Sequence, residues 1–409
     1  MSMVFIVGVG MTPFGRFLES SVKSLARSAV QQALKDAGAT PEQVDVAFFA
    51  NTTQGALEGQ LMIGGQIALR PIGFQNIPIA NIENACASGA TALHLAHAYI
   101  KAGLAEVALA VGVVKMYSTD KARSASIFNG GWDVHEVDAI AATLRSISAG
   151  LEAPPEREAG GNSIFMDLYA SLAKAHMRDY GTTERQLAVV ASKNHAHSTM
   201  NPLSQYRNAM SVEQVLGARV IAWPLTLPMC APISDGAAAA ILCSETALKR
   251  FPAARPVRVH ASVLASGSDR APAEPERHIC RLAATKAYEM AGMGPEDMSV
   301  AEVHDASAFA EIVQTENLGF CELGQGGWLA EHRQTALGGR IPVNPSGGLE
   351  CKGHPIGATG LGQIHELTLQ LRGEAGARQV ENARLGIAEN GGGFLGVEEA
   401  AACVTLLGA

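Results

Sequence analysis

Apolar and polar positions follow two different patterns along this chain, and the contrast predicts its elements. Continuous apolar runs predict strands buried on both faces, because such strands have no solvent-facing side chains. Two such runs occupy residues 4–9 and 107–114, and the mainly apolar residues 44–50 predict a further strand. Residues 24–37 instead repeat apolar side chains at helical spacing and end at Gly38, which predicts a helix with a glycine stop. The succession of strands and helices predicts a largely parallel sheet covered on both faces.

The pattern changes from about residue 117 to residue 224, where polar and aromatic residues become more frequent. Pro154-Pro155-Glu156 predicts a loop there, and residues 163–180 have the period of a helix. A buried-strand pattern returns at residues 237–243. We therefore divide the chain into a first half, residues 1–118 completed by about 225–265, a loop domain, residues 119–224, and a second half, residues 266–409.

Two stretches of the chain repeat each other, and one has a cysteine where the other has a histidine. Cys86-Ala-Ser-Gly-Ala-Thr aligns with His354-Pro-Ile-Gly-Ala-Thr, and residues 33–44 match residues 287–298 in the same order. Two matches at similar separations predict that the halves are diverged copies of one α/β unit. Related halves usually pack about a pseudo-twofold axis, where equivalent positions can meet. The thiol of Cys86 and the imidazole of His354 would then form a nucleophile–base pair.

Composition and charge restrict the class of protein. With 409 residues, 47% hydrophobic and 17% charged, the chain has the composition of a globular protein of two or three domains. Its net charge of −8 argues against nucleic acid as a main partner. The seven cysteines are an odd number without a C-x-x-C pair, which fits a reducing compartment and predicts no metal site.

The chain also lacks the features of a membrane or secreted protein. Its first 15 residues predict a strand rather than a signal peptide. No apolar run reaches the roughly 20 residues needed to span a bilayer. We therefore expect a cytoplasmic protein without a membrane partner.

Cys86 is the first candidate catalytic residue. It lies between a predicted strand at residues 79–82 and a helix that begins near Ala87. The unpaired amides at a helix start lower the pKa of a thiol and can hold a negatively charged oxygen. We therefore expect Cys86 to be a reactive thiolate. We also expect the amides of this helix start to form half of an oxyanion hole. The other six cysteines are expected to be small core residues.

His354 is the candidate general base. It lies in residues 344–360, a segment with five glycines, which let a main chain approach a ligand closely. Gly353 and Pro355 flank it at the start of a predicted helix. An imidazole held in this way is better placed for proton transfer than a histidine in an ordinary loop.

Two strand ends in the second half supply further candidates. His304 follows a predicted strand at residues 300–303, at the edge where α/β sheets bind ligands, although it could instead be a loop cap. Glu389-Asn390-Gly391-Gly392-Gly393 follows a predicted strand at residues 384–388. The glycine amides of that turn suit the second element of an oxyanion hole.

With these motifs the chain resembles the thiolase family along essentially its whole length. Asn84-Ala-Cys-Ala-Ser-Gly resembles the nucleophile motif. Asn344-Pro-Ser-Gly-Gly, followed by Lys352-Gly-His-Pro-Ile-Gly-Ala-Thr-Gly, resembles a highly specific signature of the family. Val303-His-Asp resembles the sterol-carrier-protein-type, or lipid-transfer-protein-like, branch, as does the segment at residues 193–206. The resemblance implies a duplicated five-layered α-β-α-β-α fold with an inserted loop domain.

The resemblance also implies the chemistry. Thiolases cleave or form carbon–carbon bonds in coenzyme A (CoA) thioesters, so CoA would be a co-substrate and no cofactor would be bound covalently. Cys86 would attack the keto carbon of a 3-oxoacyl-CoA, and His354 would activate its thiol. His304 and His354 would polarise the thioester oxygen, while the amides of Cys86 and Gly391 would hold the other oxyanion. Two more substrate-binding residues are implied, Gly392 and Asn344.

The chain departs from the family at three positions. Glu389 stands where conventional thiolases have a second cysteine, and Ala306 stands where the carrier-protein branch has one. Glu389 could act as the acid/base if burial raises its pKa, but a structural glutamate is the alternative, with Cys351 as a more remote acid/base. Ser307 replaces a bulky phenylalanine and would widen the acyl pocket, which favours a branched or aromatic acyl-CoA.

The implied assembly is a homodimer or a dimer of dimers, and the departures also fit subfamilies that work with a small zinc-ribbon/OB-fold partner. Two other functions stay open. One is retro-aldol cleavage of a hydroxyacyl-CoA, which needs no acyl-enzyme. The other is a non-catalytic CoA- or lipid-binding subunit of a complex, which the loss of the second cysteine would permit.

Overall fold

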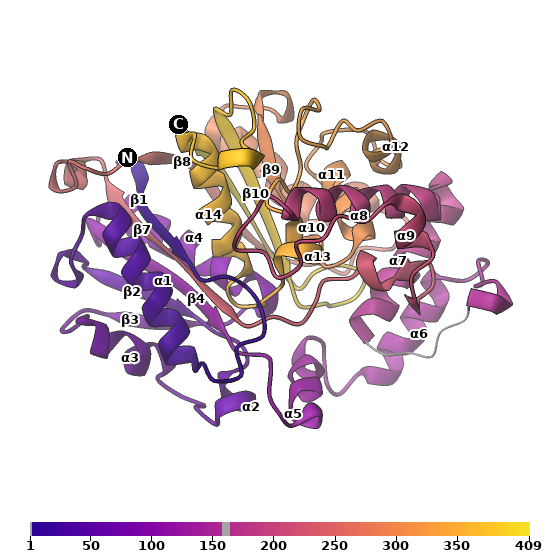
Figure 1. The fold of residues 1–409 in the computed structure, drawn as a ribbon, viewed down its shortest axis with the longest axis horizontal. Helices are drawn as coiled ribbons and strands as arrows, with labels where there is room; N and C mark the ends of the chain where they lie inside the picture. The colour runs from indigo at the N-terminus through magenta and orange to yellow at the C-terminus, as the bar shows by residue number, and fades with distance from the viewer. Residues whose placement is uncertain (1, 158–163) are drawn as a thin grey trace.

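Nine strands form one continuous sheet in the computed structural model, which describes residues 2–157 and 164–409. Their order across the sheet is β3-β2-β4-β7-β1-β8-β11-β10-β9 (Figure 1). The first five in this order come from residues 4–244 and the last four from residues 257–408. The strands are β1 Val4–Met11, β2 Val46–Ala50, β3 Ile79–Ile82, β4 Val107–Val114, β7 Gly236–Ser244, β8 Val257–Ser266, β9 Val300–Glu302, β10 Leu385–Gly392 and β11 Ala401–Gly408.

The expectation of a largely parallel sheet is wrong, because the sheet is mixed. Within the described part of this sheet, β2 pairs in parallel with β3 and β4, and β9 pairs in parallel with β10. The other pairs are antiparallel. β7 pairs in this way with β4 and β1, β11 with β10 and β8, and β1 with β8. Residues 393–400 link β10 directly to β11, and so short a connection can join only antiparallel neighbours.

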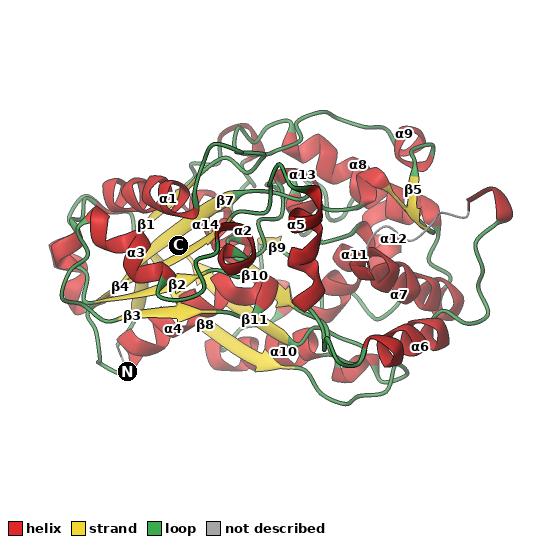
Figure 2. Cartoon of the chain, turned by 90° about the horizontal axis from the view of Figure 1, so that it is seen from below, coloured by secondary structure: helices red, strands yellow, loops and turns green. Residues whose placement is uncertain are grey.

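Helices complete a five-layered α-β-α-β-α arrangement around the two blocks of strands. α1 packs on β1 and β7 from one side, and α10 packs on β8 and β11 from the other. α4 and α14 lie between the blocks and contact each other (Figures 1 and 2). The helices of the two halves are α1 Val22–Ala37, α2 Gln54–Glu58, α3 Gly64–Leu69, α4 Ser88–Lys101, α10 Ile279–Ala291, α11 Ala308–Asn317, α12 Gly326–Glu331, α13 Gly348–Lys352 and α14 Thr359–Arg372.

The two halves meet at the stretches that repeat in sequence. A Cβ on Gly89, at the start of α4, would lie 3.0 Å from the carbonyl oxygen of Gly357, just before α14. The missing side chain therefore lets the two helix starts touch through their backbones. β1 and β8 also join the blocks through three residue pairs, from Val4 with Val259 to Ile6 with Val257. The segments of Cys86 and His354 are thus brought together as the repeat predicts.

The loop domain is mainly helical and packs against the second half. Its apolar residues share one core with Ala308, Phe309 and Ile312 of α11 and Ala330 of α12. The predicted helix at residues 163–180 begins at Ile164 within the described part, and Ser163 lies outside it. The elements of this domain are α5 Lys121–Ser126, α6 Val137–Ile147, α7 Ile164–Tyr180, α8 Glu184–Ser198, α9 Val212–Leu216, β5 Val220–Ala222 and β6 Leu225–Thr226.

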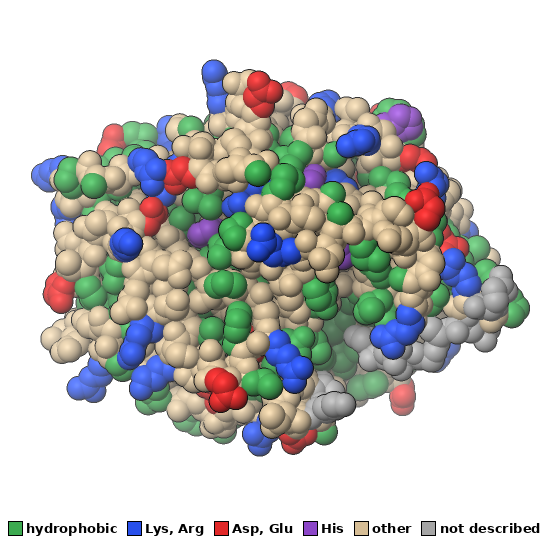
Figure 3. Space-filling model, in the orientation of Figure 1, with side chains coloured by type: hydrophobic (Ala, Val, Ile, Leu, Met, Phe, Trp, Pro, Cys, Tyr) green, Lys and Arg blue, Asp and Glu red, His purple; other side chains and the backbone are tan. Residues whose placement is uncertain are grey.

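The surface carries charges of both signs. On the face shown in Figure 3, lysine and arginine side chains are scattered among acidic and apolar ones rather than gathered into one broad patch. Among the described helices, none has the length and apolar character required to cross a membrane.

Candidate active site

A cavity of about 1280 Å³ lies where the first half, the second half and the loop domain meet. Cys86, His304 and His354 lie in its wall, which is otherwise mostly apolar. A cavity of this size can hold a sizeable part of a large ligand. The aromatic side chains in the wall are Tyr117, Phe128, Trp132, Phe165, Tyr169, Tyr206, Phe309 and Phe394.

Cys86 sits in a single 3-10 turn, Ala85–Ala87, that leads directly into α4. The turn is fixed at both ends. Ser88 Oγ accepts a hydrogen bond of 2.8 Å from the amide of Asn84 and donates one of 2.6 Å to the carbonyl of Ala85. Asn84 Nδ2 in turn donates to Thr91 Oγ1 at 3.0 Å. These bonds hold the half-buried thiol at the cavity wall in one orientation.

The sulfur of Cys86 and one ring nitrogen each of His304 and His354 all lie within 4.8 Å of one another. The two imidazole rings are 5.1 Å apart between centroids and nearly perpendicular, at 82°. His304 follows β9, and His354 lies between α13 and α14. Three residues from distant parts of the chain therefore form one group, as the sequence predicts.

The hydrogen bonds of the two histidines give them different proton positions. The hydroxyl of Thr359 donates to the carbonyl of Pro355 at 3.1 Å, so its oxygen accepts from His354 Nδ1 at 2.8 Å. His354 Nε2 is therefore left with a free lone pair. Asn390 Nδ2 donates to His304 Nδ1 at 3.0 Å, which puts the proton of His304 on Nε2. His354 is thus arranged as a proton acceptor and His304 as a donor.

The expected low pKa of Cys86 is wrong. Burial raises the pKa of Cys86 to about 12, and this outweighs the opposing hydrogen bonds from the amides of Gly393 and Cys86 itself. Burial also lowers the pKa of His304 to about 4, and burial beside His304 lowers the pKa of His354 well below its ordinary value. The resting group is therefore a neutral thiol between two neutral imidazoles. A thiol in this state needs a neighbouring base before it can attack a carbonyl.

The predicted glycines of the turn lie close to the nucleophile. Gly391 and Gly392 line the cavity and end β10, where they pair with β11. A Cβ on Gly392 would collide with the carbonyl of Asn84 and the amide of Ala87, so only glycine fits there. The amide that bonds to the sulfur of Cys86 belongs to the next residue, Gly393, at φ 64°. The oxyanion role of Gly391 and Gly392 stays a prediction.

Glu389 lies in the layer behind the cavity wall. Its side chain is fully buried and is absent from the lining. Its Oε2 accepts from the amide of His304 at 2.9 Å, and the thiol of Cys280 donates to its Oε1 at 3.2 Å. Burial and the charge of Glu399 raise the pKa of Glu389 to about 8. The raised pKa is as predicted, but the carboxyl group has no access to the cavity. Cys351 is likewise buried and outside the lining.

Ser307 and Asn344 also lie outside the lining and hold the backbone in place. Ser307 is the N-cap of α11 and accepts from the amide of Ala310 at 3.3 Å, and a wider acyl pocket at this position stays a prediction. Asn344 accepts from the amide of Val303 at 2.9 Å and donates to Glu311 at 2.8 Å. Asn344 therefore fixes the strand end that carries His304.

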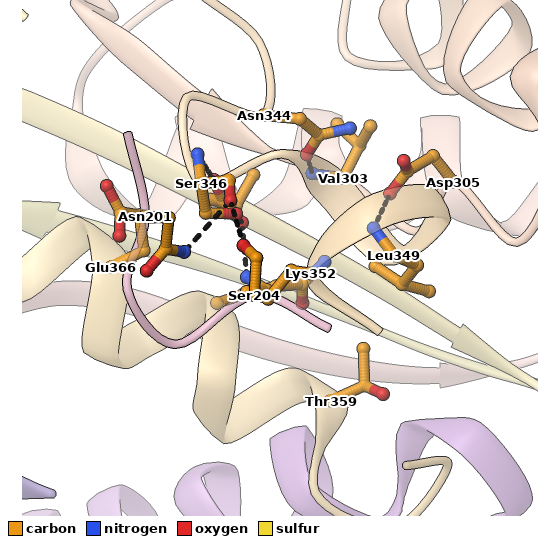
Figure 4. A network of polar contacts seen from close by, with 12 residues as sticks. Asn201, Ser204, Val303, Asp305, Asn344, Ser346, Leu349, Lys352, Thr359 and Glu366 are labelled. Atoms are coloured by element: carbon orange, nitrogen blue, oxygen red, sulfur yellow. Dashed lines mark hydrogen bonds and ion pairs between the residues drawn. The ribbon is translucent and has the colours of Figure 1, made fainter. Parts of the chain in front are cut away.

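A polar network supports the signature segment from behind (Figure 4). Asn201 Nδ2 and Ser204 Oγ both donate to the carbonyl of Ser346, at 2.9 and 3.2 Å. Asp305 accepts from the amide of Leu349 at 2.7 Å. The loop domain thus supplies part of the support for the segment that presents His354. Residues 193–206, which carry the loop-domain motif, contact the signature segment at residues 344–360 in the folded protein.

Four residues of the site were not predicted from the sequence. Glu399, His278 and Gln314 line the cavity beside Gly391, and Tyr169 lines it from the loop domain. Glu399 belongs to a Glu-Glu pair just before the last strand, which reads as an ordinary solvated turn. His278 and Gln314 lie in helical contexts without a motif, so no local signal in the sequence marks them.

Comparison with known proteins identifies the family. Residues 4–217 match the family model described as thiolase, N-terminal domain, and residues 269–406 match the one described as thiolase C-terminal domain-like. The chain therefore belongs to the thiolase family, and it is an acyltransferase.

Several curated proteins are similar over most of the chain. Acetyl-CoA acetyltransferase of Methanothermobacter thermautotrophicus is 39% identical over 399 residues, which cover 95% of this chain and 96% of that protein. Sterol carrier protein 2 of Gallus gallus is 37% identical over 95% of this chain and 69% of that protein. Benzoylsuccinyl-CoA thiolase subunit BbsB of Thauera aromatica is 34% identical over 92% of this chain and 91% of that protein.

Solved structures support the fold. The Ltp2-ChsH2(DUF35) aldolase matches with a TM-score of 0.76 at 22% identity, covering 100% of this chain and 98% of that chain. Human mitochondrial 3-ketoacyl-CoA thiolase matches with a TM-score of 0.70 at 17% identity, covering 100% of this chain and 99% of that chain. At these identities the likeness concerns the fold alone.

Proposed function

We propose that the protein is a 3-oxoacyl-CoA thiolase that cleaves or forms a carbon–carbon bond through an acyl group carried on Cys86. The observation that carries this proposal is the group of Cys86, His304 and His354, with reactive atoms within 4.8 Å in one cavity. Both imidazoles have lowered pKa values and are neutral at physiological pH, so one can accept the thiol proton while the other donates a hydrogen bond.

In the cleavage direction, His354 Nε2 accepts the proton of the Cys86 thiol as the sulfur attacks the keto carbon at C3. In our proposal the amides of Cys86 and Gly391 stabilise the negatively charged oxygen that forms. The bond between C2 and C3 then breaks, and its electron pair moves into the thioester carbonyl of the departing acyl-CoA. His304 Nε2–H stabilises that enolate oxygen. The enolate takes up a proton at C2 and leaves as the shortened acyl-CoA. The thiol of CoA then loses its proton as its sulfur attacks the acyl group on Cys86. The departing sulfur of Cys86 takes back its proton from His354 Nε2, and the acyl group is released as a new thioester.

The cavity favours a bulky apolar acyl group, branched or aromatic. Phe165 stands against Phe128 and Trp132, with ring centroids 6.2 and 5.2 Å apart, so the wall offers aromatic faces and edges. The similarity to a benzoylsuccinyl-CoA thiolase subunit supports an aromatic acyl group. CoA is the co-substrate, and no covalently bound cofactor takes part.

The assembly we propose is a homodimer, or a dimer of dimers, joined through β3. β3 is the edge strand of the first block, and an edge strand offers unpaired backbone groups to a second chain. Leu61, Met62 and Ile63 expose 80%, 75% and 58% of their surfaces close by, between α2 and α3. A small zinc-ribbon/OB-fold partner belongs to the same proposal, because BbsB is named as a subunit. Light scattering of the purified protein, alone and with such a partner, tests the assembly.

The test of function is CoA-dependent cleavage of a panel of 3-oxoacyl-CoAs, with intact mass measured after mixing. We expect an acyl adduct on Cys86 and faster cleavage of branched or aromatic substrates than of straight-chain ones. Cys86→Ala should lose several orders of magnitude of turnover, because the substitution removes the thiol that carries the acyl group in the proposed covalent route.

Two outcomes would contradict the proposal. Cleavage of a hydroxyacyl-CoA that persists in Cys86→Ala would indicate a retro-aldolase. Binding of acyl-CoA without any adduct or cleavage, in the presence and absence of a partner subunit, would indicate a non-catalytic subunit.

A further inference from the structure

A second group of chemically active side chains opens onto the same cavity and has no part in the steps above. Glu399 lies in the connection between β10 and β11, and His278 is the N-cap residue of α10. One ligand atom each of His278, Cys280 and Glu399 lie within 4.8 Å of one another. Glu399 and His278 line the cavity, whereas Cys280 lies behind them.

Hydrogen-bond donors converge on the carboxylate of Glu399. Gln314 Nε2 donates to Oε1 at 2.9 Å. His278 Nδ1 accepts from the amide of Cys280 and from Asn317 Nδ2, both at 3.2 Å, so its proton is on Nε2. That Nε2 faces Glu399 Oε2 at 3.4 Å. The carboxylate is therefore held in one orientation by two neutral donors, which leaves it available to a substrate proton.

The glycines of β10 place this carboxylate beside the nucleophile. A Cβ on Gly391 would lie 2.6 Å from Glu399 Cγ, so the missing side chain provides the room that Glu399 occupies. The following residue, Gly392, touches the turn that carries Cys86. The negative charge of Glu399 also contributes to the raised pKa of Cys86. Glu399 and Cys86 are thus neighbours across two glycines.

We propose that Glu399 is the catalytic residue that moves the proton at C2 of the acyl-CoA, with His278 and Gln314 as positioning residues. This inference rests on the proposed thiolase function and supplies its missing second acid/base. In the condensation direction, the carboxylate removes a proton from C2, the C–H electron pair moves into the thioester carbonyl, and an enolate forms. In the cleavage direction, the protonated carboxyl group returns a proton to C2 of the enolate.

The other candidates for this role lack access or the right proton state. Glu389 and Cys280 are fully buried and absent from the lining. Tyr169 lines the cavity, but burial and the charge of Glu399 raise its pKa well above the ordinary value, so the phenol cannot act as a base. Glu398 lines the cavity, but Arg270 pairs with it at 2.6 Å. Unlike these four residues, Glu399 combines access to the cavity with a carboxyl group oriented by neutral donors.

The test separates proton transfer from acylation. The purified protein is incubated in D₂O with acetyl-CoA, propionyl-CoA and succinyl-CoA in turn, and deuterium uptake at C2 is followed by mass spectrometry. All variants are made in the Cys86→Ala background, where acylation cannot occur, so the exchange reports the action of the base alone. We expect exchange with at least one of the three thioesters.

Glu399→Gln should lower the exchange rate about 10²–10⁴-fold, the usual scale for the loss of a general base. Glu399→Asp should recover part of it. The matched control is Glu381→Gln, which removes an exposed carboxyl group outside the cavity lining and should leave the exchange rate unchanged. For the positioning residue, His278→Gln should lower kcat of the complete reaction without changing KM.

Three results would overturn the assignment: no exchange with any thioester, normal exchange in Glu399→Gln, or an equal loss in Glu381→Gln. Failure of the thiolase proposal itself gives a different result, because the protein with Cys86 intact would then form no acyl adduct whatever the exchange rate. A folded Glu399→Gln variant, verified by its thermal unfolding, is required for either conclusion.

Discussion

Two acidic clusters lie close to the strand ends that carry His304 and Glu389, and they differ in how their charges are balanced. The first, here the lysine cluster, consists of Glu302, Glu311, Lys193 and Lys352. Lys193 Nζ pairs with Glu311 at 2.6 Å, and Lys352 Nζ pairs with Glu302 at 2.9 Å. The second, here the thiol cluster, consists of Glu389, Glu399, His278 and Cys280. Within the part of the chain that the structure describes, neither of its carboxyl groups pairs with a lysine or arginine.

This difference in charge balance indicates that the lysine cluster has a structural role and that the thiol cluster is suited to proton transfer. In each lysine–glutamate pair two buried charges compensate each other. Transfer of a proton to or from one member would leave the other charge buried without a partner, which costs free energy. In the thiol cluster, burial and the charge of Glu399 raise the pKa of Glu389 to about 8, so Glu389 holds a proton at neutral pH. A cluster without a cation is therefore one that can move a proton.

The largest effect is expected from breaking the lysine cluster. Lys352→Met leaves Glu302 buried without its cation, and the pKa of Glu302 is already raised by burial. We expect the free energy of unfolding to fall by about 3–5 kcal/mol, the usual scale for stranding one partner of a buried pair. Denaturant unfolding measures the loss. The double variant Lys352→Met with Glu302→Gln should regain much of it, and equal stability of the single variant and the wild type would contradict this account.

In the thiol cluster, replacing Glu389 is expected to raise the free energy of unfolding rather than lower it. The pKa of Glu389 is higher in the folded protein than in the unfolded chain, so the folded state binds the proton more tightly and stability falls as pH rises from about 4.5 to about 8. Glu389→Gln removes this fall. The variant should match the wild type near pH 4.5 and exceed it at pH 8 and above, by a few kcal/mol on the scale of about 1.4 kcal/mol per pKa unit.

Thermal unfolding of both proteins between pH 4.5 and 9 measures that difference. A wild-type curve parallel to that of Glu389→Gln would show that Glu389 does not titrate in this range. If Glu389 itself were the acid/base catalyst, Glu389→Gln would lose the deuterium exchange at C2 of the acyl-CoA.

The smallest effect is expected at Cys280, which connects the two carboxyl groups of the thiol cluster. Its thiol donates to Glu389 at 3.2 Å and faces Glu399 at 3.8 Å. Cys280→Ser keeps a donor and should change little, whereas Cys280→Val removes it and should destabilise by about 1 kcal/mol. Thermal unfolding of the two variants at pH 6 compares them. An equal loss in both would mean that packing, not the hydrogen bond, determines the contribution of Cys280.

The sequence predicted those features that depend on local pattern or on the repeat. The strands at residues 79–82 and 107–114 have the predicted bounds. Pro78 precedes the first, and the charged residues Glu106 and Lys115 border the apolar run of the second. The helix predicted from residue 24 begins two residues earlier, at Val22, where Ser21 caps it. The meeting of Cys86 and His354 was predicted because the repeat relates their positions.

The remaining features depend on the three-dimensional surroundings of each residue. A helix start lowers the pKa of a thiol only where the thiol stays hydrated, and the degree of burial at Cys86 cannot be read from its neighbours in sequence. β7 pairs antiparallel with both β4 and β1, and an apolar strand pattern does not reveal the direction in which a strand enters the sheet. Glu399 and His278 are more than 100 residues apart in the chain and meet only in the folded protein.

The place of β7 in the sheet has a consequence for any attempt to divide the molecule. β7 lies between β4 and β1, in the middle of the first block, yet it follows the loop domain in sequence. A fragment ending at residue 224 would therefore lack its central strand and leave β1 and β4 with unpaired backbone groups facing each other. A chain cut there would supply two pieces, each with an incomplete core, that regain a native sheet only on recombination. The same geometry makes this fold a candidate split reporter, with thiolase turnover as its signal.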